Sequence, residues 1–160
     1  MEYSWEYRRL GDATYHIVPQ QQNKPFVMQW VKREWELDLA ALPDQPWTAQ
    51  WLALLPDMEF ALEILRMDGI RLRSDLLHHK TETYDSMPGL RARTEERQES
   101  LPHSVSAGPL LVNRAGLALM DAYTRYMVMR KLHQHEVYAY VGTVDSASMN
   151  PRGQTACGDV

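Results

Sequence analysis

The sequence predicts an α+β domain, with helices concentrated in its first half and strands in its second. Apolar residues recur at helical spacing through much of the first 68 residues. Short apolar runs at residues 109–113, 117–120 and 137–141 fit buried strands instead. The 160 residues are enough for one domain with a substantial core. We therefore expect helices and a sheet to share one domain.

The first half begins with a predicted strand at residues 13–18, which Pro19 ends. Phe26, Trp30 and their helical repeats predict a helix over residues 26–42. A further apolar stripe follows Pro46, and Pro56 must split it. Asp57 is a good N-cap, so we predict that residues 58–67 form a second helical piece.

All five tryptophans lie between residues 5 and 51. Such a cluster could line an aromatic pocket, or it could be a helical layer packed by large rings. We favour the packed layer, because large rings supply much of the apolar area that a core buries.

The second half begins with a predicted short strand at residues 70–72, followed by a polar loop and a charged, solvated helix at residues 90–101. The runs 109–113 and 117–120 then form a predicted hairpin. A helix to Leu132 and a strand at residues 137–141 complete the domain. Residues 143–160 are small and polar, which predicts a flexible tail.

Composition favours an ordinary globular protein of the cytoplasm. The net charge is -4, with 17 basic and 21 acidic residues, so a large nucleic-acid surface is not expected. Cys157 is the only cysteine, which excludes a disulfide within the chain and fits a reducing compartment. No apolar run approaches the roughly 20 residues that span a bilayer, and the first residues do not resemble a signal peptide.

The turn at residues 121–125 is the candidate phosphate site. A helix that follows a strand presents its first N–H groups to an anion. Asp121 could act as a base, Thr124 offers a hydroxyl, and the planar fork of Arg125 suits phosphate oxygens. Taken alone, the pattern fits a simpler interpretation better, in which Asp121 caps the helix and Arg125 pairs with the acidic surface.

Metal sites are not predicted. His78 and His79 lie in a polar loop, and no third ligand has the spacing of a metal site. His133 and His135 flank Gln134 in what we interpret as a polar link between helix and strand.

The order of these elements resembles the ParB/sulfiredoxin superfamily over roughly residues 69–142. The matching parts, in chain order, are residues 70–72, 96–100, 109–112, the turn Leu-Met-Asp-Ala-Tyr-Thr-Arg at 119–125, and 137–141. The resemblance implies a small mixed β-sheet with helices, preceded by a helical, tryptophan-rich segment at residues 1–68 and followed by the tail 143–160.

The resemblance also implies a nucleotide-phosphate site. Asp121 would be the base or a metal-side carboxylate, and Arg125 the phosphate-binding arginine. The backbone N–H groups of Tyr123 and Thr124 would hold phosphate oxygens. Ala122 replaces the glycine of the family, which makes close approach of a phosphate to the backbone harder. Glu82 is the nearest candidate for a second carboxylate.

Three functions follow from the resemblance. The first is a phosphotransferase that uses ATP or ADP with Mg²⁺ on a small-molecule hydroxyl, similar to the kinases of free serine. In it the tryptophan-rich segment would form the acceptor side of the cleft. The second is a non-catalytic switch that binds CTP or another nucleotide, with a protein partner at the tryptophan-rich segment. A DNA-binding or nuclease-like module is the third, and the absence of a basic stripe disfavours it.

Overall fold

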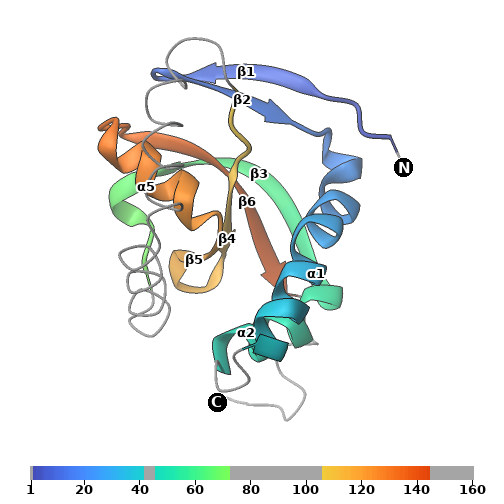
Figure 1. Ribbon diagram of the computed structural model, residues 1–160. Coiled ribbons are helices and arrows are strands. Elements are labelled where there is room, and N and C mark those ends of the chain that lie inside the picture. Colours follow the sequence, from blue (N-terminus) through green and yellow to red (C-terminus); the bar gives the residue numbers. More distant parts are fainter. Residues whose placement is uncertain (1, 42–45, 73–105, 145–160) are drawn as a thin grey trace, which may run out of the picture.

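The computed structural model describes residues 2–41, 46–72 and 106–144. The regular elements are β1 (Glu6–Leu10), β2 (Ala13–Ile17), α1 (Asn23–Ala41), α2 (Pro46–Leu54), β3 (Met58–Arg66), β4 (Leu110–Asn113), β5 (Ala118–Asp121), α5 (Tyr123–Lys131) and β6 (Glu136–Val144). Helices and strands alternate irregularly along the chain (Figure 1). The α+β class predicted from the sequence is confirmed.

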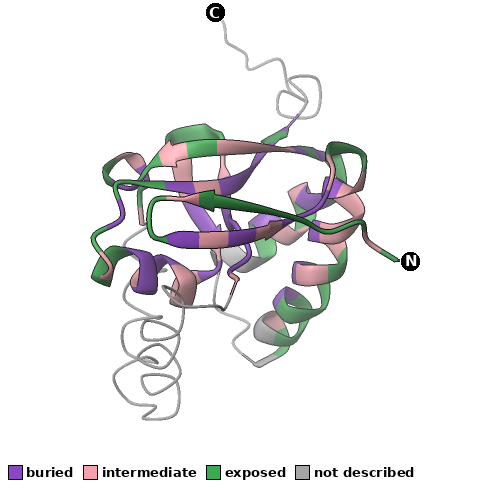
Figure 2. Ribbon diagram, turned by 90° about the horizontal axis from the view of Figure 1, so that it is seen from above, coloured by how far each residue is buried: buried purple, intermediate pink, exposed green. Residues whose placement is uncertain are grey.

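A mixed sheet of four strands, in the order β3-β6-β4-β5, forms the centre of the fold. β6 runs antiparallel to β3 over nine residue pairs and parallel to β4. β4 and β5 form the predicted antiparallel hairpin. β4 and the middle of β6 are buried, as expected for strands covered on both faces (Figure 2).

Alternate residues of these strands pack into two separate hydrophobic clusters. On β4, Leu110 and Val112 belong to one cluster and Leu111 to the other. Adjacent residues of a strand point to opposite faces, so this division follows from the pleat. The first cluster includes residues of α5 and β2, and the second includes residues of α1 and α2. The sheet therefore lies between two apolar layers.

The hairpin of β1 and β2 is a separate two-stranded sheet that packs on the central one (Figures 1 and 2). Backbone bonds join it to the segment that leads into β4. His16 N donates to Ala107 O, and Ala107 N donates to Thr14 O, both at 2.9 Å. This link brings β2 close to the start of β4, although the two are about ninety residues apart in sequence.

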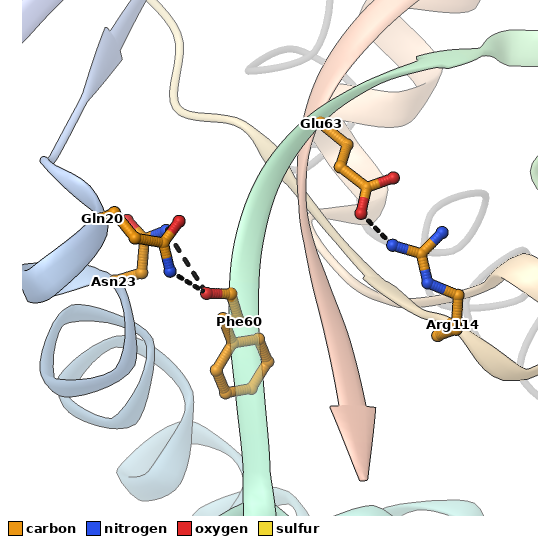
Figure 3. A network of polar contacts seen from close by, with 5 residues as sticks. All are labelled: Gln20, Asn23, Phe60, Glu63 and Arg114. Atoms are coloured by element: carbon orange, nitrogen blue, oxygen red, sulfur yellow. Dashed lines mark hydrogen bonds and ion pairs between the residues drawn. The ribbon is translucent and has the colours of Figure 1, made fainter.

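Polar contacts join β3 to its surroundings (Figure 3). The side-chain amide of Gln20 donates to the carbonyl oxygen of Phe60 at 2.7 Å. Because β3 is an edge strand, this bond satisfies a carbonyl and blocks one position at which another strand could pair. Glu63 forms an ion pair with Arg114, which follows β4. Both side chains are partly exposed, so this pair adds little stability.

The helix predicted at residues 58–67 is wrong, because Met58–Arg66 is the strand β3. Met58, Leu62 and Leu65 have helical spacing, yet a short apolar run fits both periods. Met58 and Phe60 pack in the cluster of α1 and α2, which is the alternation of a strand. β6 supplies backbone hydrogen bonds along the whole length of residues 58–66, and these bonds stabilise the strand over the helix.

The segment 1–68 is consequently not helical throughout. It contains α1 and α2, as predicted, but also β1, β2 and β3. A boundary at residue 69 falls directly after a strand that is paired with β6. The predicted strand 70–72 is reduced to a single parallel bridge between Arg71 and Ala118.

The predicted elements of residues 109–141 are present. The hairpin, the helix α5 and the final strand are confirmed, although β6 continues to Val144 and so includes the first two residues of the predicted tail. The predicted loop at residues 78–89, the charged helix at 90–101 and the rest of the tail lie outside the described residues.

The packed aromatic layer is confirmed for two tryptophans. Trp35 and Trp51 are 1% and 3% exposed, and their ring centroids lie 6.1 Å apart. Trp30 is only half-buried, and Trp5 is 43% exposed. The four tryptophans whose side chains the structure describes therefore divide into a core pair and two that reach the surface.

Candidate functional site

The β5–α5 turn has an unusual backbone. Ala122 stands between the end of β5 and the first residue of α5, with φ 73° and ψ 40°. This left-handed conformation costs a residue with a Cβ about 1–2 kcal/mol, whereas glycine adopts it freely. The superfamily that the sequence resembles has glycine at this position. The chain thus keeps a backbone geometry that suits glycine while carrying alanine.

Asp121 fixes the turn through both of its carboxylate oxygens. Oδ2 accepts a hydrogen bond from Trp35 Nε1 at 2.7 Å, and Oδ1 accepts one from Ala122 N at 2.6 Å. The N-cap position of α5 is occupied by Ala122, without a side-chain cap. The interpretation of Asp121 as a helix cap is therefore wrong. Its carboxylate instead ties the turn to α1.

The first turn of α5 carries the predicted phosphate-binding groups. Tyr123 and Thr124 are the first two residues of the helix, and both are partly exposed. Their backbone N–H groups precede the first bond of the helical pattern, which runs from Tyr126 N to Ala122 O at 2.9 Å. N–H groups at the start of a helix carry the positive end of its dipole.

Arg125 lies one residue further along, in a half-buried position. Its Nη1 donates to the carbonyl oxygen of Pro109 at 2.7 Å. The guanidinium carbon lies 4.6 Å from the centroid of the Trp30 ring, a favourable cation–π distance. α1 and the segment before β4 thus hold the guanidinium near the start of α5.

Two further polar residues extend the site, and sequence reasoning did not single them out. His16 of β2 lies close to Arg125, and Ser106 Oγ is 2.9 Å from His16 Nδ1. Neither belongs to a recognisable motif, and ninety residues separate them, so no local signal in the sequence pairs them.

The remaining candidates are not brought to this turn. Glu82, His78 and His79 lie outside the described residues. His133 and His135 follow the far end of α5, about 13 Å along the helix from its start. His135 lines two neighbouring hollows of about 240 and 400 Å³ together with Gln134 and Glu136, and His133 lines the smaller one. Across residues 2–41, 46–72 and 106–144, no three His, Cys, Asp or Glu side chains are grouped as metal ligands would be.

A separate cavity of about 530 Å³ lies between α2 and the ends of β4 and β6. It contains none of the predicted site residues. Its lining consists of Gln50, Trp51, Leu54, Asn113, Arg114, Ala115, Ala118, Thr143 and Val144.

No helix in the described part of the chain is long and apolar enough to cross a membrane.

No family model and no curated protein matches the chain. Among solved structures, the chain is similar to the C2221 form of a pNOB8-like ParB N-domain, with 21% identity over 61% of this chain and a TM-score of 0.42. A second structure of the pNOB8-like ParB N-domain matches 57% of this chain with 22% identity and a TM-score of 0.39. The matches span 34% and 30% of those chains, about a third of their length.

Proposed function

We propose that this chain binds a nucleoside phosphate at the start of α5. The N–H groups of Tyr123 and Thr124 and the guanidinium of Arg125 would hold the phosphate oxygens. These donors are of the kinds that bind phosphate, and the positive end of the helix dipole adds to them. ATP, ADP and CTP are the ligands to test, each with Mg²⁺, because Mg²⁺ commonly accompanies nucleotide phosphates.

The observation that carries this proposal is the left-handed backbone at Ala122. Strained residues persist where the surrounding structure enforces them, and they concentrate at ligand sites. Here the strained residue directly precedes the helix N-terminus, and the bonds of Asp121 hold the turn in place. The turn is therefore preorganised, which lowers the cost of ordering it around a ligand.

A binding protein without turnover is the function that this geometry supports best. Both oxygens of Asp121 already accept hydrogen bonds from the protein. These two hydrogen bonds give the carboxylate a role in holding the turn. A nucleotide-dependent switch requires such a fixed turn and requires no base.

The phosphotransferase remains the second candidate, because the same two bonds also hold the Asp121 carboxylate in one orientation beside the helix start. A base must be held in this way to accept a proton from an acceptor hydroxyl. On this hypothesis Asp121→Asn abolishes nucleotide consumption while nucleotide binding persists. Consumption is measured with ATP or ADP, Mg²⁺ and free serine. Tight binding without consumption in the unsubstituted protein excludes the phosphotransferase with this acceptor.

The binding proposal is tested by thermal unfolding with ATP, ADP, CTP and GTP, each with and without Mg²⁺. A nucleotide at a hundred times its Kd stabilises the native state by about 2.7 kcal/mol, a shift that is easily measured. If none of the four shifts the unfolding of the unsubstituted protein, the proposal is refuted.

Two substitutions locate the bound phosphate. Arg125→Lys keeps the charge but loses the planar fork, so we expect binding to weaken at least about tenfold. Arg130→Lys is the matched control, since Arg130 is exposed in the last turn of the same helix. Ala122→Gly adopts the left-handed backbone freely and removes a methyl group from the turn. It should bind at least as tightly as the unsubstituted chain, and weaker binding would argue against a phosphate at this turn.

A further inference from the structure

His16 and Ser106 form a polar pair next to the proposed phosphate site. His16 lies on β2, Ser106 directly precedes the bridge residue Ala107, and His16 Nδ1 is 2.9 Å from Ser106 Oγ. The backbone bonds between Ala107 and the residues of β2 fix the two segments side by side. The backbone of the fold therefore holds the two residues next to each other.

Gly108 brings this pair to Arg125. A Cβ placed on Gly108 would lie 2.9 Å from Arg125 Nη1 and 3.4 Å from His16 Nε2. The guanidinium and the imidazole therefore border the same point of the backbone, within about 6 Å of each other by the sum of these distances. A side chain at Gly108 would displace the guanidinium, so glycine at this position lets Arg125 lie close to His16.

The chemistry of the cluster favours an anion. Burial, and then the nearby Arg125 guanidinium, lower the pKa of His16. The imidazole is consequently neutral at neutral pH, and an anion bound beside it and Arg125 would favour its protonated form. In the protonated imidazole, Nδ1–H donates to Ser106 Oγ, which leaves the Ser106 hydroxyl, the Nε2–H of His16 and the guanidinium as hydrogen-bond donors to phosphate oxygens. Trp5 packs edge-on against His16 and is 43% exposed, so the cluster lies near the surface.

We propose that His16, Ser106 and Arg125 form a second phosphate subsite, which takes the terminal phosphate of a nucleoside di- or triphosphate. This inference rests on the proposed function, in which the first phosphate lies at the start of α5. Arg125 serves both subsites, because it belongs to the first turn of α5 and also borders Gly108. The ligand class is thereby narrowed from any nucleotide to one with at least two phosphates.

The test is an NMR titration of the whole chain with inorganic phosphate and with pyrophosphate. It follows the imidazole resonances of His16 and the amide resonances of Tyr123 and Thr124. Pyrophosphate should shift both sets of resonances and raise the pKa of His16. Binding is measured in parallel by calorimetry, where Ser106→Ala should weaken pyrophosphate binding about three- to tenfold. Ser106→Thr, which keeps the hydroxyl, should restore it, and Thr143→Ala is a control at an exposed position on β6.

The outcomes separate this inference from the proposed function. If the amides of α5 shift while His16 does not respond, the second subsite is refuted and the first stands. If His16 responds while the amides do not, the subsite stands and the proposed site at α5 fails. If pyrophosphate moves neither set, both are refuted. A Ser106→Ala protein that unfolds at the same temperature and binds pyrophosphate as tightly as the unsubstituted chain also overturns the subsite.

Discussion

The bond between Trp35 and Asp121 should couple α1 to the β5–α5 turn energetically, and a double-mutant cycle measures that coupling. Trp35→Phe removes the indole N–H together with part of the ring. Asp121→Ala removes the acceptor, including the bond to Ala122 N. The loss of the bond to Ala122 occurs in the single and in the double variant, so it cancels from the coupling energy.

The magnitude follows from the burial of the two groups. A hydrogen bond to a charged group contributes about 1.5–3 kcal/mol, and the low end applies here because Asp121 is partly exposed. We therefore expect a coupling of about 1–1.5 kcal/mol. Trp35→Phe alone should cost more, about 2–3 kcal/mol, because Trp35 is 1% exposed and the smaller ring leaves a void beside Trp51.

The assay is urea unfolding followed by far-UV circular dichroism, since tryptophan fluorescence changes with the substitution itself. Trp51→Phe combined with Asp121→Ala is the control cycle, because it shrinks the neighbouring ring of the same pair. A Trp35–Asp121 coupling below about 0.3 kcal/mol, within the usual additivity error, would refute the view that this bond holds the turn.

Two other features give separate predictions. Gly142→Ala should destabilise the fold by about 1–3 kcal/mol, because its Cβ would lie 2.4 Å from Met58 Cε and 2.8 Å from Phe60 Cε1. Gly69→Ala, with 3.9 Å to its nearest neighbour, is the control, and equal urea midpoints for the two variants would contradict the packing argument. Burial raises the pKa of Tyr15 to about 12 from its ordinary value of 10.0. The unfolded chain therefore loses this proton first, and stability should fall as pH rises from 10 towards 12. Tyr15→Phe should reduce that fall in thermal unfolding, and an unchanged pH dependence would show that Tyr15 does not cause it.

Local patterns were enough to predict several elements that frame the site. The apolar runs around Arg114–Gly116 gave a hairpin, and the following helix and final strand lie where spacing placed them. Each of these depends on residues close together in sequence: a turn between two strands, or a helix that begins directly after a strand. The order of these elements also pointed to the turn at residues 121–125 as the candidate site.

The secondary structure of residues 58–66 could not be decided from the local sequence. Their apolar side chains satisfy both a helical and an alternating period, and Asp57 favours a helix start. The choice is made by β6, which lies about eighty residues later and pairs with this segment along its whole length. The pattern of apolar residues within either strand does not reveal a pairing partner so far away in the sequence.

The sequence by itself determined the α+β class, the hairpin, α5 and the position of the β5–α5 turn, because these rest on period and on turn residues. The tertiary structure decided which side chains surround the turn. It set Asp121 against Trp35, placed Arg125 on Trp30, and brought His16 close to Arg125 with Ser106 beside His16. These contacts join α1, β2 and α5 across long stretches of chain. They exist only because the two faces of the sheet must both be covered, which folds distant segments onto the same edge of the molecule.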